Sequence, residues 1–439
     1  MTDLLELSAR FVDGAVGGGR VPDESTNRMT LELSEVAPDI AVVESFSHMV
    51  ALRTDDGLVL FDASLAALAE PVIGALRGWS DDPVHTLVYT HGHVDHVGGG
   101  RAVLHEAAAR GYRAPTVVAH EAVPARLDRY ALTAGYNAAV NARQFGREGL
   151  TGLDEQGRPV FAADVARPDL TYRDHHTTTV GSTPLHLHHA RGETDDHTWT
   201  WIPQHRAASV GDLVLWVFPN AGNPQKVQRH PAEWATALRT IAAAEPELLL
   251  PAHGLPIGGR DRIAVVLDET ATVLESLVDQ TLELMNGGQS LDTILHTVRV
   301  PSHLLDRPYL QPVYDEPEFV VRNIWRLYGG WYDGNPARLK PAPDAEVAGE
   351  VAALAGGAAV LAARAEALSA AAVDADGHRL ACQLAEWAVQ ADPHDATARA
   401  VAAAVYRARR GVERSLMAKG IYGAAAECFE HPGPPTVAG

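Results

Sequence analysis

The run THGHVDHVGG at residues 90–99 constrains this chain more than any other feature of its sequence. It places four potential metal-binding side chains, His91, His93, Asp95 and His96, within six residues. The run follows VHTLVYT, an apolar and β-branched stretch that predicts a strand. A strand that ends in such a cluster brings polar side chains to the edge of a sheet, where α/β proteins usually hold their sites.

The spacing of these four side chains predicts a centre for two metal ions. His91 and His93 would serve one ion, and Asp95 and His96 the other, at the separation of roughly 3.5–4 Å found in two-metal sites. The glycines that follow allow the backbone to turn tightly into the next helix. The alternative is a solvated polar loop in front of a helix, but this pattern after a strand rarely arises by chance.

The order of the predicted elements indicates an α/β fold. Short apolar strands over residues 38–65, and strands near residues 84–90 and 115–120, alternate with helices. A second group of strands covers residues 171–212, and helices over residues 232–246 and 260–286 follow it, with the β-run ELLLPAH between them. Two successive sets of strands and helices predict an αββα sandwich.

The last third of the chain has a different character. After Pro343 the sequence is rich in alanine with helical periodicity, and two helical halves flank an Asp-Pro turn at residues 392–393. We therefore expect a catalytic α/β domain over residues 1–295, an all-α domain over residues 296–430 and a disordered tail over residues 431–439.

Charge and composition exclude several classes of partner. The formal net charge of −20 disfavours binding to nucleic acid or to an anionic membrane surface, because both would repel the chain at long range. Only two cysteines occur, so a disulfide framework and a cysteine-rich zinc site are excluded. The acidic N-terminus resembles no signal peptide, and no apolar run of about 20 residues follows, so we expect a cytoplasmic protein.

The HxHxDH run resembles the metal-binding motif of the metallo-β-lactamase superfamily. The resemblance implies that later strand ends complete the site, with Asp212 bridging both ions, His253 on the second ion and Glu193 on the first. A glutamate in a Gly-Glu context at the last of these places resembles the alkyl sulfatases of this superfamily. Weaker competitors for the place of Glu193 are His186, His188, His189 and His197.

Three more blocks resemble the alkyl sulfatases. Residues 134–137, with Arg143 and Phe145-Gly146 after them, resemble a loop beside the active site, and residues 328–336 are close to a Gly-Trp-Phe-Asp-Gly-Asn-Pro motif. The alanine-rich helices resemble the family's dimerisation domain. This resemblance implies a homodimer formed through the C-terminal helices.

Cations and amides just after the Asp212 strand are suited to bind the non-bridging oxygens of a sulfate. This segment contains Asn220, Asn223, Lys226, Arg229 and His230, and His230 is the expected proton donor. The alternative for the segment is a basic surface loop. By resemblance, Asn137, Tyr314 and Arg322 are further candidates for contact with the substrate.

We thus predict a binuclear zinc hydrolase that cleaves a sulfate ester of a small-molecule alcohol, with two Zn²⁺ ions per chain. Asp95 and His230 are the expected catalytic residues. Such a metal pair makes hydroxide available near neutral pH. The alternatives are a two-metal hydrolase of a thioester, lactone or phosphoester, and a non-catalytic metal-binding scaffold for oligomers.

Overall fold

The computed structural model describes residues 3–14, 23–26, 28–145 and 164–431. The chain divides into two compact units. The first contains residues 1–132 and 161–330, and the second contains residues 133–160 and 331–439. The sequence-based division at residue 295 stays a prediction, and the expected tail, His431 apart, lies outside the described residues.

The strands of the first unit form two sheets. Within the described residues one sheet has seven strands, in the order β1-β2-β3-β4-β5-β6-β7, and the other has six, in the order β13-β12-β11-β10-β9-β8. The first sheet consists of β1 (Leu33–Ala37), β2 (Ile40–Val43), β3 (Met49–Thr54), β4 (Gly57–Phe61), β5 (Val84–Val88), β6 (Thr116–His120) and β7 (Leu170–Tyr172). The second consists of β8 (His175–Val180), β9 (Thr183–Ala190), β10 (His197–Ile202), β11 (Ala207–Gly211), β12 (Leu248–Pro251) and β13 (Ile257–Gly258).

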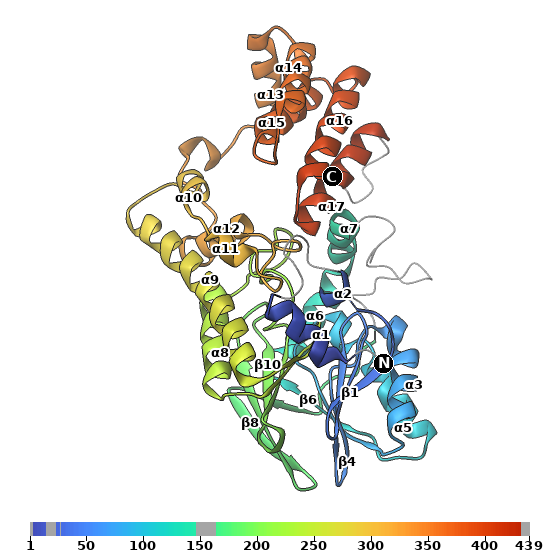
Figure 1. Ribbon diagram of the computed structural model, residues 1–439. Helices are drawn as coiled ribbons and strands as arrows, with labels where there is room; N and C mark the ends of the chain where they lie inside the picture. The colour runs from blue at the N-terminus through green and yellow to red at the C-terminus, as the bar shows by residue number, and fades with distance from the viewer. Residues whose placement is uncertain (1–2, 15–22, 27, 146–163, 432–439) are drawn as a thin grey trace. The chain divides into compact units, whose positions relative to one another are not determined.

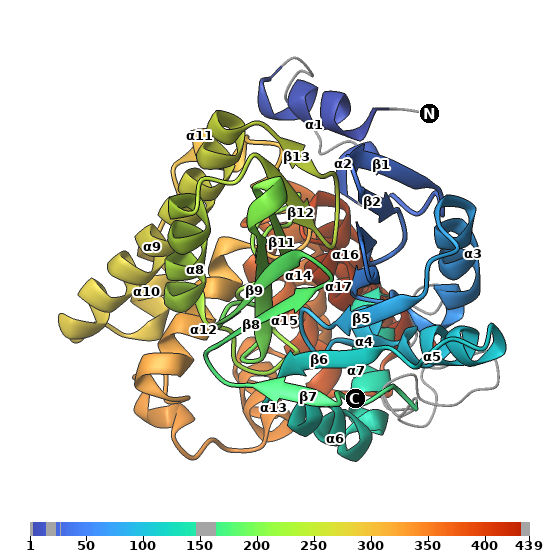
Figure 2. The same cartoon turned by 90° about the horizontal axis from the view of Figure 1, so that it is seen from below.

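Helices cover the outer faces of the sheets. In the first unit they are α1 (Leu4–Val12), α2 (Asp23–Thr26), α3 (Ala69–Trp79), α4 (Val94–Val97), α5 (Gly100–Ala109), α6 (Val123–Leu132), α8 (Pro231–Ala243), α9 (Arg260–Asn286), α10 (Leu291–Thr297), α11 (Ser302–Leu305) and α12 (Pro317–Gly329). Figure 2 shows α3 and α5 beside the first sheet and α8 and α9 beside the second. This arrangement is the predicted αββα sandwich.

Three apolar cores hold these layers together, because each sheet buries side chains on both faces. Val59 and Phe61 of β4 pack between the sheets with Leu185 and Leu187 of β9. Leu58 and Leu60 of the same strand point the other way and pack against α3. The alternation follows from the two-residue period of a strand, which sends neighbouring side chains to opposite faces.

The parallel strands position the site. β4, β5 and β6 run parallel to one another, and in the second sheet β11 runs parallel to β12. The loops that follow parallel strands emerge at the same edge of a sheet. Asp62, His91, Asp212 and His253 all lie just after one of these strands.

The second unit is helical. It contains α7 (Ala134–Phe145), α13 (Asp344–Ala355), α14 (Ala358–Ala371), α15 (His378–Ala391), α16 (Ala396–Val412) and α17 (Leu416–Glu430), the last five drawn in orange to red in Figure 1. α15 and α16 are the two halves predicted around the Asp-Pro turn. The core of this unit contains Ala365, Ala381, Ala385 and Ala402, whose small side chains let the helices approach closely.

Some elements differ from the sequence-based expectation. The last strand of the group predicted over residues 171–212 ends at Gly211, because that glycine takes a φ of +51° and turns the chain. The helices α6 and α7 were not predicted from the sequence. In the described part of the chain no single helix is long and apolar enough to cross a membrane, although α13 and α14 together satisfy that test across an 87° bend.

Candidate metal centre

The structure brings the seven predicted ligands together where the ends of β5, β11 and β12 meet. Among the described residues, two groups of side chains have ligand atoms that all lie within 4.8 Å of one another. The first group contains His91, His93, Glu193 and Asp212. The second contains Asp95, His96 and His253.

Asp212 lies between the two groups. Its Oδ2 atom is 3.7 Å from Nε2 of His91 and 3.4 Å from Nε2 of His96, and its Oδ1 atom is 3.7 Å from Nε2 of His253. Asp95 Oδ2 lies 3.3 Å from the same nitrogen of His253. This position of Asp212 is the one expected of a carboxylate shared by two ions.

Asp62 orients the centre from behind, and the sequence analysis did not single it out. Its Oδ2 atom lies 2.8 Å from Nδ1 of His96 and accepts a hydrogen bond of 2.7 Å from the Thr90 hydroxyl. Its Oδ1 atom accepts a second bond from the Thr90 backbone amide. An aspartate that directly follows the strand beside VHTLVYT was the available sign in the sequence.

The backbone turn at Gly211 aims Asp212 at the ligands. Gly211 has a φ of +51°, and a Cβ atom there would lie 2.7 Å from Cβ of Thr90 and 2.9 Å from Cε1 of His197. The Asp212 amide donates a hydrogen bond of 3.1 Å to Nε2 of His197. His197 thus supports the backbone beside the ligand Asp212 and is not a member of either group.

Burial and charge shift the pKa values of the first group. Burial lowers the pKa of His91 and of His93 well below the usual range, so both imidazoles are neutral and able to bind a cation. Burial also raises the pKa of Glu193, and the nearby Asp212 carboxylate adds to this rise. A divalent cation would reverse the shift at Glu193, because it favours the ionised ligand.

The second group, together with the shared Asp212, combines carboxylates with imidazoles of opposite charge. Burial opposes ionisation of Asp95 and Asp212, but His96 and His253 outweigh it and hold both pKa values well below the usual range. The same carboxylates overcome burial at His96 and raise its pKa. Protons on His96 and His253 therefore balance carboxylate charge here, which is the role that a metal cation would take.

These residues fit a divalent metal. His96 Nε2 and Asp212 Oδ1 are buried atoms that make no hydrogen bond with any described residue. Ligand atoms of a tetrahedral zinc site lie about 3.4 Å apart when each bond is about 2.1 Å. His96 Nε2 lies 3.4 Å from both Asp95 Oδ2 and Asp212 Oδ2, which matches this spacing.

Arg229 and Asn220 of the predicted sulfate-binding segment contact a ligand directly. Arg229 is buried, with Nη1 3.1 Å from Oε1 of Glu193, and it donates a hydrogen bond to the Glu193 backbone carbonyl. The Asn220 amide donates to the Glu193 carboxylate, whereas its Oδ1 atom is buried without a partner among the described residues. The segment therefore lies against the first group of ligands.

The rest of this segment is fixed by residues near α12. Asp315, which is buried, accepts hydrogen bonds of 2.6 and 3.1 Å from the backbone amides of Gly222 and Asn223. The neighbouring Tyr314 interacts electrostatically with Glu193. Burial lowers the pKa of Lys226 to about 8, and Arg229 adds to this fall. Asn223, Lys226 and Tyr314 thus lie in the part of the fold that surrounds Glu193.

His230 caps α8 beside the same ligand. Its backbone amide donates a hydrogen bond of 3.0 Å to the carbonyl of Gly192, the residue before Glu193. Its Nδ1 atom has no hydrogen-bond partner among the described residues and lies 3.8 Å from Glu233. The roles predicted for His230 and its neighbours stay predictions, although the structure places them beside the ligands.

Two other predicted substrate residues contact the residue four positions earlier in the chain. Arg322 lies on the exposed side of α12, in an ion pair of 3.1 Å with Glu318 one turn earlier. Asn137 belongs to α7 of the second unit, where its amide donates to Thr133. Gly146, named with the loop that contains Asn137, lies outside the described residues. Contact of Arg322 and Asn137 with the substrate stays a prediction.

The three histidines of β9 contact residues outside the two ligand groups. His186 lies 3.2 Å from the Thr177 hydroxyl, and His188 stacks on Trp199 at a centroid distance of 4.5 Å. His189 stacks on His120 of β6 at 3.7 Å. None of the three belongs to either group, so Glu193 takes the place for which they competed.

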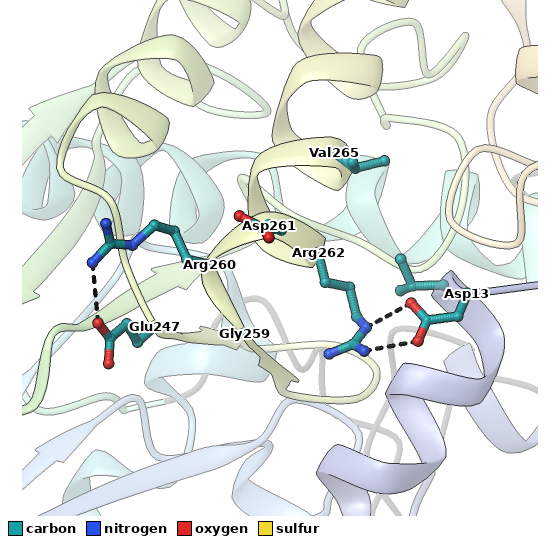
Figure 3. A pocket seen from close by; sticks show the side chains of 8 residues that line it. Asp13, Glu247, Gly259, Arg260, Asp261, Arg262 and Val265 are labelled. Atoms are coloured by element: carbon teal, nitrogen blue, oxygen red, sulfur yellow. Dashed lines mark hydrogen bonds and ion pairs between the residues drawn. The ribbon is translucent and has the colours of Figure 1, made fainter.

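A cavity of about 840 Å³ lies elsewhere in the first unit, between the end of α1 and the start of α9. Its cations are already neutralised. Figure 3 shows Arg262 facing Asp13 and Arg260 facing Glu247, in ion pairs of 2.7 and 3.2 Å. Both arginines that line the cavity are therefore paired with acidic side chains.

An αββα sandwich that gathers seven such ligands after the ends of its strands defines a divalent-metal protein of the metallo-β-lactamase type. A family model described as "Metallo-beta-lactamase superfamily" matches residues 42–253, and one described as "Alkyl sulfatase dimerisation" matches residues 290–431. Residues 42–253 thus form a domain of the metallo-β-lactamase superfamily, and residues 290–431 form a domain of the alkyl sulfatase dimerisation type.

Curated relatives point to the same group. A linear primary-alkylsulfatase of a Pseudomonas species is 28% identical over 373 residues, which cover 81% of this chain and 69% of the relative. An (R)-specific secondary-alkylsulfatase from Pseudomonas is 26% identical over 84% of this chain and 58% of the relative. An alkyl/aryl-sulfatase of Saccharomyces cerevisiae is 25% identical over 73% and 52%, respectively.

A solved structure has the same fold. The stereoselective inverting sec-alkylsulfatase Pisa1 from Pseudomonas superposes with a TM-score of 0.78 at 24% identity, over 92% of this chain. The match covers 66% of that protein. The chain thus spans between about half and about two thirds of the length of these relatives.

Proposed function

We propose that this chain is a binuclear zinc hydrolase of sulfate monoesters. It takes an alkyl sulfate and water to an alcohol and hydrogen sulfate, which loses its proton to the solvent. The observation that carries the proposal is the convergence of two ligand groups, shared by Asp212, beside a segment with two cations. The printed names of the relatives favour sulfate esters as the substrate class.

The bound ions would supply Lewis acidity, which ionises a water near pH 7 and polarises the ester oxygens. His91, His93, Glu193 and Asp212 would hold one ion, and Asp95, His96 and His253, with Asp212 shared, would hold the other. Five of these seven ligands lie on four separate loops after strands, so the scaffold fixes their positions before substrate arrives.

The residues around Glu193 would recognise the sulfate group. Lys226 and Arg229 are cations, and the Asn220 amide donates a hydrogen bond to the Glu193 carboxylate. Fixed cations in a buried site stabilise the charge that gathers on sulfate oxygens in the transition state. An ester without this anionic group would lack these contacts. The segment would therefore select for an anionic ester.

His230 would deliver a proton to the leaving oxygen. Burial lowers its pKa, which makes the imidazolium a stronger acid, and Nδ1 has no described partner to hold it. A positioned general acid typically increases a rate by about 10²–10⁴-fold. Its position at the start of α8, one hydrogen bond from Gly192, keeps it beside the first ligand group.

The decisive experiment compares turnover on several ester classes. The zinc-loaded full chain is assayed with primary and secondary alkyl sulfates, thioesters, lactones and phosphate monoesters. We expect release of inorganic sulfate to have the highest kcat/KM. Faster cleavage of a thioester, lactone or phosphoester would overturn the substrate class, and a metal-loaded chain inert on all classes would favour the scaffold alternative.

We also propose that the chain forms a homodimer through the helices of the second unit. The family model that matches residues 290–431 supports this. Several large apolar side chains on these helices and the turns between them are exposed, among them Leu354 at 88% and Val373 at 91%. Contact with a second copy would remove such surface from water, which favours association.

A further inference from the structure

Arg126 and Asp196 form a buried ion pair next to the first ligand group. Nε of Arg126, on α6, lies 2.6 Å from Oδ2 of Asp196, and the same guanidinium also contacts the Asp195 carboxylate. The side chains of Arg126 and Asp196 are 2% and 0% exposed. Burial of such a pair costs desolvation energy, so a buried pair is weak evidence for stability by itself.

Asp196 connects two metal-binding segments. Its Oδ2 atom accepts a hydrogen bond of 3.1 Å from the amide of Gly92, the residue between His91 and His93. Asp196 also lies three positions after Glu193, in the loop between β9 and β10. One carboxylate oxygen thus joins the histidine loop of the first sheet to the glutamate loop of the second.

Arg126 packs against the backbone of Gly92 beside Asp196. A Cβ atom at Gly92 would lie 2.8 Å from Cδ of Arg126 and 3.0 Å from Oδ2 of Asp196, so the pair packs directly against the backbone at this glycine. Arg126 also forms a side-chain hydrogen bond with Tyr130, whose ring centroid lies 6.4 Å from that of His93. A planar guanidinium with several donors can serve these partners at once, whereas a lysine cannot.

We propose that the Arg126–Asp196 pair is a positioning device that sets the metal affinity of the group formed by His91, His93 and Glu193. The pair touches no ligand atom and acts through the backbone of Gly92 and through the loop that carries Glu193. This inference rests on the proposed metal site. It adds residues of the second sheet and of α6 to the machinery that holds the metal.

The experiment measures zinc affinity in full-length variants. Arg126→Lys keeps the charge but loses the planar fork, and Asp196→Asn keeps the shape but loses the charge. Residues that orient metal ligands typically change metal affinity by 10–100-fold, so we expect each variant to release one of its zinc ions to a competing chelator at about 10–100-fold lower chelator concentration. The other zinc ion should be retained at close to the parent affinity.

A matched pair elsewhere in the first unit serves as the control. Arg77 of α3 binds Glu106 of α5 with two contacts of 2.7 and 2.8 Å, and their side chains are 8% and 17% exposed. Arg77→Lys and Glu106→Gln should lower the melting temperature without changing zinc affinity. A control variant that weakened zinc binding as much as Arg126→Lys would show a general loss of stability and overturn the proposal.

The remaining outcomes separate this inference from the function on which it rests. A parent chain that binds no zinc contradicts the metal site itself. If the parent binds two zinc ions and both Arg126→Lys and Asp196→Asn bind zinc within twofold of the parent affinity, the metal site stands. Only the positioning role is then overturned. Should Asp196→Asn fail to fold, Arg126→Lys decides alone, and a zinc affinity within twofold of the parent in that variant would overturn the positioning role.

Discussion

Asp62 Oδ2 lies 2.8 Å from Nδ1 of His96, so the carboxylate that follows β4 fixes the orientation of an imidazole on the short helix α4. Both side chains are buried. The other nitrogen of His96 therefore faces Asp95 and Asp212. A carboxylate behind a metal-binding histidine sets its tautomer and raises its strength as a ligand.

This contact predicts that Asp62→Asn weakens zinc binding by about 10–100-fold, as measured by chelator competition. Asp39→Asn is the matched control, because Asp39 and Asp62 have similar backbone φ angles of 65° and 60° and asparagine tolerates both. The Asp39 side chain is 51% exposed and far from any ligand contact described above. Equal zinc affinity in both variants would refute the orienting role of Asp62.

We expect Gly211→Ala to destabilise the first unit strongly. A Cβ atom would meet Thr90 at 2.7 Å in a left-handed backbone conformation, which costs about 1–2 kcal/mol for the conformation and about 1–3 kcal/mol for the overlap. Gly111→Ala is the control, since Gly111 has a φ of +72° but nothing within 4 Å. Thermal unfolding should show a markedly larger fall for Gly211→Ala, and similar melting temperatures would contradict this account.

Removal of the metal should lower the melting temperature of the whole chain. The ligand groups bury several charged side chains, and binding of an ion to the folded state alone stabilises it by about 2.7 kcal/mol at a free concentration of 100 times Kd. Zinc added after chelation should restore the melting temperature of the parent. His93→Ala combined with Asp95→Ala should abolish this response, and a full response in that variant would argue against the assigned ligands.

His230→Gln should lower kcat on an alkyl sulfate by about 10²–10⁴-fold with little change in KM, because the imidazole donates a proton and the amide does not. Glu233→Gln is the control for a change beside His230, because Glu233 lies 3.8 Å from His230 and belongs to neither ligand group. The zinc content of both variants should equal that of the parent. A kcat within threefold of the parent in His230→Gln would assign the proton transfer to another group.

Light scattering should give a mass close to twice the 46.9 kDa of one chain at micromolar concentration. The apolar side chains exposed on the second unit provide the surface for this association. Dilution should shift the mass toward that of one chain only at much lower concentration. A mass of 46.9 kDa at micromolar concentration would rule out the homodimer.

The sequence predicted the sandwich because its strands and helices can be recognised from the local periodicity of their apolar residues. It also predicted the cluster of His91, His93, Asp95 and His96, since these residues share one loop and need no tertiary contact to be recognised together. Glu193, Asp212 and His253 were found only through a family resemblance. Nothing local distinguishes them from other polar residues at the ends of strands.

By itself the sequence determined the layered fold and the loop that supplies four ligands, because both depend on residues close together in the chain. Only the tertiary structure decided which distant side chains meet that loop. Asp62 contacts His96 from the end of another strand, Arg126 and Asp196 pack against the backbone of Gly92, and Arg322 lies on the exposed side of α12. Such meetings depend on how two sheets and their covering helices pack, which local patterns do not encode.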